Sequence, residues 1–174
     1  LEKIKFPITF KALEPDKIKF IPLGMKEELS GFQILQRHPT GKEYSHLLAK
    51  KEKYPIFIDS ENKILSMPPI INSELTGKIE TTTKDVFVEC SGFDLNILKK
   101  CLNIVVTTLA DMEGRIHSVE VRYKNKEVTP NLEPEKMKIE IENANKILGI
   151  KIDERKTKDL LERMGYSYNK KTVL

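Results

Sequence analysis

Prolines divide the first half of this 174-residue chain into short extended pieces. Pro7, Pro15 and Pro22 separate the first apolar stretches from one another. Proline has no amide hydrogen to donate and restricts its predecessor to extended angles, so it marks edges, turns and strand ends. The pair Pro68 and Pro69 must form a rigid, non-helical segment, which is a suitable platform for a pocket.

The spacing of apolar residues predicts the elements between these prolines. Residues 56–58 read as a buried strand that turns at 59–62 and returns through 64–67 as a hairpin, and residues 86–88 read as a further strand. Asp94 is expected to cap the longest helix, which we expect to anchor the core. Its apolar positions recur at helical spacing: Leu95, Leu98, Leu102, Val105 and Leu109.

Two further signals define short helices and a change of character along the chain. Ser30 followed by Gln33 resembles a capping box and predicts a helix to about Arg37. Beyond Pro130 two prolines occur in five residues, and two short helices then end at glycines. We therefore predict a first domain at 1–129 and the start of a small second module at 130–174.

The predicted fold class is α+β, with mixed sheet layers packed on the long helix and a partial second α+β module. The chain opens at Leu1 and not at a methionine, so we expect it to be excised from a longer protein.

Composition excludes several classes of protein. No run of about 18 apolar residues exists, which predicts a soluble, cytoplasmic protein without membrane contact. A net charge of +4 permits RNA binding but does not indicate it. Cys90 and Cys101 lack metal-ligand spacing, so no metal site is expected. No glycine-rich phosphate loop is present, so no ATP site is expected here either.

Two segments, 64–73 and 85–94, resemble in order and spacing the beta subunit of archaeal/eukaryotic-type phenylalanyl-tRNA synthetase. Five other blocks are similar to the same family: 21–23, 35–44, 54–59, 146–149 and 161–166. The resemblance thus covers nearly the whole chain. One departure is the sequence Ser91, Gly92, Phe93, where that family often carries Thr-Gly-Thr or Thr-Ala-Thr.

The resemblance implies an α2β2 enzyme whose alpha subunit uses ATP and Mg²⁺ to charge tRNA(Phe). The beta module would hydrolyse tRNA(Phe) wrongly charged with tyrosine, in trans to that site. It implies no cofactor in this chain, and a magnesium site of the full subunit would lie beyond Leu174. The main alternative is a tRNA-binding or subunit-assembly domain of the same synthetase without hydrolytic activity, and a third is an unrelated nucleic-acid-binding α/β protein.

An editing pocket of this kind needs a buried hydrogen-bond acceptor. An apolar pocket rejects one added hydroxyl by roughly 10²-fold, whereas a pocket that requires the hydroxyl rejects its absence by about 10⁴-fold or more. Glu89 is the first candidate, because alternation along the expected strand puts its carboxylate at a strand end. Ser91 projects to the same face. The alternatives are an exposed or ion-paired Glu89 and a helix-entry cap at Ser91.

Other polar residues are candidates for contacts to the substrate. Ser66 is proposed as a third catalytic residue, and Asn72 and Ser73 as donors to the ester carbonyl. Turn chemistry is the alternative for Asn72 and Ser73. Phe57 is proposed to line the aromatic pocket, although an aromatic residue in a buried strand is usually core.

The turn after the short helix is a candidate RNA contact. Arg37, His38 and Lys42 place basic groups there that can meet the phosphate backbone. A solvated loop is the alternative. The sequence holds no Ser/His/Asp constellation, so the expected nucleophile is a positioned water.

Overall fold

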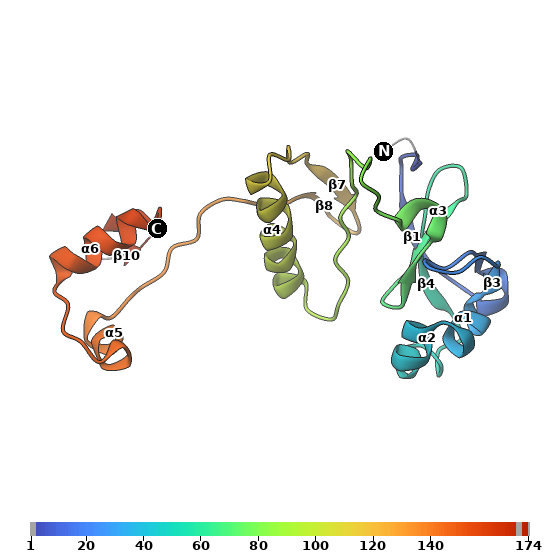
Figure 1. The fold of residues 1–174 in the computed structure, drawn as a ribbon, viewed down its shortest axis with the longest axis horizontal. Coiled ribbons are helices and arrows are strands. Elements are labelled where there is room, and N and C mark those ends of the chain that lie inside the picture. The colour runs from blue at the N-terminus through green and yellow to red at the C-terminus, as the bar shows by residue number, and fades with distance from the viewer. Residues whose placement is uncertain (1–2, 170–171, 174) are drawn as a thin grey trace. The chain divides into compact units, whose positions relative to one another are not determined.

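The structure is a computed structural model that describes residues 3–169 and 172–173. It divides into two compact units, Leu1–His117 and Ser118–Leu174, which are taken separately below (Figure 1). Helices occur together with small antiparallel sheets, which confirms the α+β class. The proposed domain boundary after residue 129 stays a prediction.

The first unit is built around a four-stranded antiparallel sheet. Its strand order is β1-β4-β5-β6, with bounds Thr9–Leu13 for β1, Tyr54–Ile58 for β4, Ile64–Met67 for β5 and Ile71–Asn72 for β6. The predicted hairpin is therefore confirmed as β4 and β5. Burial alternates along β4, which is the pattern of a strand with one face on the core.

Short helices and a second ribbon cover this core. The ribbon pairs β2, Lys19–Phe20, with β3, Leu29–Ser30, and the helical pieces are η1 (Pro15–Lys17), α1 (Gly31–Arg37), α2 (Pro39–Tyr44), η2 (Ser45–Leu47) and α3 (Glu74–Gly77). The capping box is confirmed, since the Ser30 hydroxyl accepts from the Gln33 amide and the Gln33 side chain accepts from the Ser30 amide. The turn expected after this helix is short, since α2 begins already at Pro39, a residue that suits a first helical turn.

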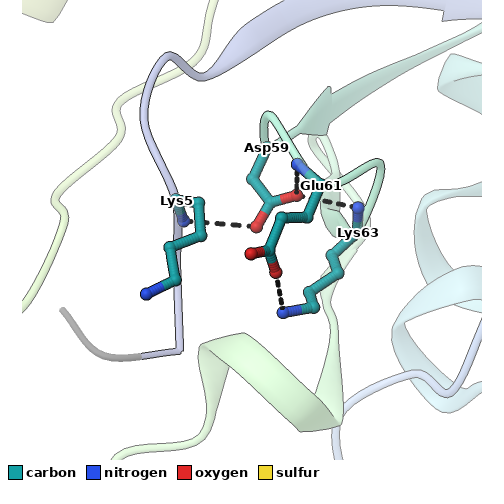
Figure 2. Close-up of polar contacts among 4 residues, drawn as sticks. All are labelled: Lys5, Asp59, Glu61 and Lys63. Carbon is teal, nitrogen blue, oxygen red and sulfur yellow. Dashed lines mark hydrogen bonds and ion pairs between the residues drawn. The ribbon is translucent and has the colours of Figure 1, made fainter.

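Asp59 organises the turn between β4 and β5 (Figure 2). Its carboxylate is 3% exposed and accepts three backbone amides, from Glu61 at 2.9 Å, Lys63 at 2.8 Å and Lys5 at 3.2 Å. The first two bonds close the turn, and the third ties it to the segment before β1. Buried carboxylates are stable only with such partners, so the hairpin and the segment before β1 depend on this one side chain.

Two expectations about the end of this unit are wrong. Residues 86–88 belong to no strand in the described chain, and Phe87 instead packs edge-to-face on Phe6 with ring centroids 6.0 Å apart. Helix α4, Leu95–Asp111, forms after the predicted cap at Asp94, whose carboxylate accepts the Asn96 and Ile97 amides. None of its residues is buried, and the core cluster comes from residues 18–70, so α4 does not anchor the core.

The second unit contains a hairpin, two helices and a short ribbon. These are β7 (Val119–Arg122), β8 (Lys126–Thr129), α5 (Ile141–Leu148), α6 (Glu154–Arg163), β9 (Tyr168–Asn169) and β10 (Thr172–Val173). Both helices end as expected, with Gly149 in the left-handed region at φ 69° and Gly165 at φ 87°. Over the described residues of both units, we find no helix with the length and hydropathy of a membrane span.

Asp59→Ala should lower the free energy of unfolding by about 1–3 kcal/mol, because three partly buried backbone amides lose their acceptor. The stability of Asp59→Asn should lie between those of the wild type and Asp59→Ala. The asparagine oxygen still accepts two amides, but its NH₂ group faces the Lys5 amide. Urea denaturation measures both, with Glu61→Ala, which removes only an exposed ion pair, as the control. Equal stability of Asp59→Ala and Glu61→Ala would contradict the assigned role.

Candidate functional site

The sheet register places three predicted site residues in one row. Phe57 on β4 lies opposite Ser66 on β5, and Ser66 lies opposite Asn72 on β6. Directly opposed residues in antiparallel strands project from the same face of a sheet. The register therefore brings together residues that the sequence separates.

A pocket of about 450 Å³ lies beside Ser66 and Asn72 of this row. Four predicted residues line it, namely Ser66, Asn72, Glu89 and Ser91. Its remaining wall is apolar and is formed by Leu23, Pro68, Pro69, Ile70 and Ile71. The pocket thus combines an apolar wall with several converging polar groups, and such converging polar groups fix the orientation of a ligand in small-molecule sites.

Glu89 is the ionisable group of this pocket. Its side chain is half-buried, and the Ser66 hydroxyl donates to its Oε2 atom at 3.5 Å. Burial raises the pKa of Glu89 above its usual value of 4.5, while hydrogen bonds from Ser91 and Ser66 oppose that rise. The pocket thus holds one carboxyl group between two hydroxyls, although Glu89 lies in irregular chain and not at a strand end.

The proline pair shapes the neighbouring wall. Pro68 is buried, and the Ile70 amide donates to the Met67 carbonyl at 2.8 Å, so the chain reverses between β5 and β6 beside the pocket. This agrees with the rigid platform predicted from the two prolines.

Leu23 is a wall residue that the sequence did not reveal. Its amide donates to the Asn72 carbonyl at 2.8 Å, and Pro22 forms an isolated bridge with Ser73. A single leucine after a proline carries no sequence signal for this pairing, because the two segments are about fifty residues apart in the chain.

Two predicted substrate contacts do not line the pocket. Phe57 stands in the row of the register, but its ring packs on Phe10 with centroids 5.0 Å apart. Ser73 is 3% exposed, and its hydroxyl accepts the Leu75 amide at the start of α3. For Ser73 the structure therefore favours the local capping alternative, and for Phe57 it favours aromatic packing within the sheet.

Of the three predicted RNA contacts, two are exposed and one is buried. Arg37 is exposed and pairs with Glu27, and Lys42 is exposed as well, so an RNA contact through either stays a prediction. His38 is 6% exposed, and both of its ring nitrogens have partners inside the protein. The exposed position that we assumed for His38 is wrong, because its ring closes a hydrogen-bond network under the pocket wall.

No group of three or more His, Cys, Asp or Glu side chains that could hold a metal ion occurs within residues 3–169 and 172–173. The pocket contributes a single carboxyl group, which is too few oxygen ligands for a bound Ca²⁺ or Mg²⁺ held by protein alone.

Two similar proteins share the same name. The chain is 49% identical over 166 residues to the phenylalanine-tRNA ligase beta subunit of Thermococcus gammatolerans, which covers 95% of this chain and 29% of that protein. It is 48% identical over 167 residues to the beta subunit of Pyrococcus abyssi, covering 95% and 30%. No protein-family model matches the sequence.

A solved structure has the same fold. It is an N-terminal fragment of the phenylalanyl-tRNA synthetase beta subunit from Pyrococcus horikoshii, with a TM-score of 0.82 and 40% identity, covering 99% of this chain and 50% of that one. This chain is homologous to part of the archaeal phenylalanine-tRNA ligase beta subunit. The resemblance noted in the sequence is thereby confirmed, and the chain spans about three-tenths of the length of its curated relatives.

Glu89→Gln should stabilise the fold at neutral pH. The folded-state pKa of Glu89 lies above that of the unfolded chain, so its stabilising contribution is complete below pH 4.5 and is lost as the pH rises through the raised pKa. Urea denaturation at pH 7 should therefore give a higher free energy of unfolding for Glu89→Gln than for the wild type. This difference in stability should disappear at about pH 3. A glutamine variant that is less stable at pH 7 would show that the carboxylate is not strained by burial.

Proposed function

We propose that this chain carries an editing site that hydrolyses Tyr-tRNA(Phe) for a phenylalanine-tRNA ligase. The observation that carries the proposal is a half-buried carboxyl group, Glu89, held between the Ser66 and Ser91 hydroxyls inside a pocket. The relatives support membership of the ligase's beta subunit, and their name does not mention hydrolysis.

The pocket meets the physical requirement for selecting tyrosine. A cavity of about 450 Å³ is in the range that encloses a small ligand, and its proline, leucine and isoleucine wall suits an aromatic ring. Glu89 provides the acceptor that a phenolic hydroxyl needs. A phenylalanyl ester in the same pocket would cover this half-buried carboxylate without supplying a further donor beyond Ser66 and Ser91, which costs about 1–3 kcal/mol.

The reaction is the hydrolysis of the ester between tyrosine and the terminal ribose. Water adds to the ester carbonyl, and the tetrahedral intermediate collapses by breaking the bond to the ribose oxygen. One proton of the attacking water goes to the ribose oxygen and the other is released to bulk water, and tyrosine leaves as its carboxylate. Asn72, which is exposed at the pocket, is placed to donate to the developing oxyanion.

Phe93 departs from the family pattern but does not obstruct this pocket. Its side chain is fully exposed, and it is not among the residues that line the cavity. The change at position 93 therefore leaves Glu89 and Ser91 accessible to substrate, which favours a hydrolytic site over a module that only binds tRNA or assembles the subunits.

The wider assembly belongs to the same proposal. The chain would act on tRNA(Phe) within a cytoplasmic α2β2 ligase, with ATP and Mg²⁺ used at the aminoacylation site of the alpha subunit. Arg37 and Lys42 are exposed basic residues that would contact the RNA backbone.

Glu89→Ala in the intact ligase should lower Tyr-tRNA(Phe) hydrolysis at least about 100-fold while charging with phenylalanine is unchanged. Deacylation of purified Tyr-tRNA(Phe) and Phe-tRNA(Phe) measures this, with the exposed Glu52→Gln as the matched control. Wild-type enzyme should leave Phe-tRNA(Phe) largely intact.

The pair Glu89→Ala and Glu89→Gln tells which substrate group Glu89 holds. Glutamine can still accept a phenolic hydrogen but cannot neutralise the α-ammonium group, so partial activity in Glu89→Gln supports contact with the phenol. Undiminished hydrolysis in Glu89→Ala would remove Glu89 from the reaction and favour the tRNA-binding alternative.

A further inference from the structure

His38, which is buried, and Thr40, which is partly exposed, form a hydrogen-bond network behind two walls of the pocket. The His38 Nε2 atom lies 3.0 Å from the Leu23 carbonyl oxygen, and its Nδ1 atom lies 2.8 Å from the Thr40 hydroxyl. The Thr40 hydroxyl in turn donates to the Ile70 carbonyl at 3.1 Å. Two side chains thus connect two separate stretches of backbone.

Both stretches are walls of the pocket. Leu23 and Ile70 line the cavity, and each also donates its amide hydrogen, Leu23 to Asn72 and Ile70 to Met67, both at 2.8 Å. Each wall residue is therefore held at its amide by the sheet region and at its carbonyl by the network of His38 and Thr40. Without the two side chains, the Leu23 and Ile70 carbonyl oxygens lose these hydrogen bonds.

The geometry specifies a hydroxyl at position 40. A carbonyl only accepts, so the Nε2 atom is the donor to Leu23. With that hydrogen on Nε2, the Nδ1 atom of a neutral ring is an acceptor, so the single hydrogen of the Thr40 hydroxyl serves either Nδ1 or the Ile70 carbonyl. Both bonds form at once only when the ring carries a second proton. In each arrangement the link from His38 to the Ile70 wall needs a hydroxyl at position 40.

The backbone that carries His38 is itself fixed. Its amide donates to the Ile34 carbonyl at the end of α1, at 3.0 Å, and its carbonyl accepts the Lys42 amide of α2, at 2.9 Å. The helices meet closely at Gly41, where an added Cβ would lie 2.0 Å from the Ile34 carbonyl oxygen. The backbone at His38 is therefore held rigidly between α1 and α2 and is not a solvated loop.

We propose that His38 and Thr40 are positioning residues that set the separation of the Leu23 and Ile70 walls, and thereby the preference of the editing pocket for tyrosine. This inference rests on the proposed hydrolysis of Tyr-tRNA(Phe). Neither side chain is a catalytic residue, since neither lines the pocket. A wall that relaxes by a fraction of an ångström misaligns the ester relative to the attacking water, and such misplacement can cost up to about 100-fold in rate.

Thr40→Val and Thr40→Ser are the decisive variants. Valine keeps the shape and removes both hydrogen bonds, whereas serine keeps the hydroxyl. In the intact ligase we expect Thr40→Val to lower kcat/KM for Tyr-tRNA(Phe) hydrolysis about 10-fold or more, mostly through kcat. Its ratio of tyrosyl to phenylalanyl hydrolysis should fall too, while Thr40→Ser stays within about 2-fold of wild type.

Thr157→Val is the matched control. Thr157 is a buried threonine of the second unit whose hydroxyl donates to the Asp153 carbonyl at 2.8 Å, so valine there removes a similar bond away from the pocket. It should leave hydrolysis unchanged. Wild-type hydrolysis in Thr40→Val, or equal losses in Thr40→Ser and Thr40→Val, would overturn the proposal.

A second measurement separates this inference from the proposed function. Hydrogen exchange of the amides at 70–73 should speed up in Thr40→Val and not in Thr40→Ser, whether or not the ligase hydrolyses Tyr-tRNA(Phe). Absence of hydrolysis in wild type would refute the proposed function alone. Unchanged exchange in Thr40→Val would refute the positioning of the wall by itself.

Discussion

The pairing of β5 on both of its edges is the constraint on which the site depends. Strand β4 fixes one edge and β6 the other, so Ser66 has a strand neighbour on each side and its hydroxyl is held in place beneath Glu89. A shift of one residue would turn Ser66 to the opposite face of the sheet and leave Glu89 without this donor. The turn at Asp59 and the reversal after Pro69 hold this register from the two ends of the strand.

Local signals account for what the sequence could predict. The cap at Asp94, the capping box at Ser30 and the hairpin of β4 and β5 all depend on neighbours within a few residues, and each is present. Residues 86–88 have the composition of a strand, but a strand needs an edge to pair with, which no local pattern reveals. Helix α4 was recognised for its periodicity, yet periodicity alone does not say what a helix packs against.

The residues predicted for the site fall into two groups, those that line the pocket and those that bond the backbone. Glu89, Ser91, Ser66 and Asn72 were chosen from residue type and family resemblance, and the fold gathers them in one pocket. Ser73 and His38 were assigned to substrate and RNA contacts because their side chains are polar, yet both are buried and serve the backbone. The link from His38 through Thr40 to Ile70 spans more than thirty residues and carries no periodic or motif signal.

One feature joins the fold to the proposed function: the Glu89 carboxyl group is half-buried in a pocket, where burial raises its pKa. The most direct test is to titrate the intact ligase with non-hydrolysable amide analogues of tyrosyl- and phenylalanyl-adenosine, using calorimetry. The account predicts that the tyrosyl analogue binds at least about 30-fold more tightly, and that Glu89→Ala removes this difference. Equal affinity of the two analogues for the wild-type ligase would contradict it.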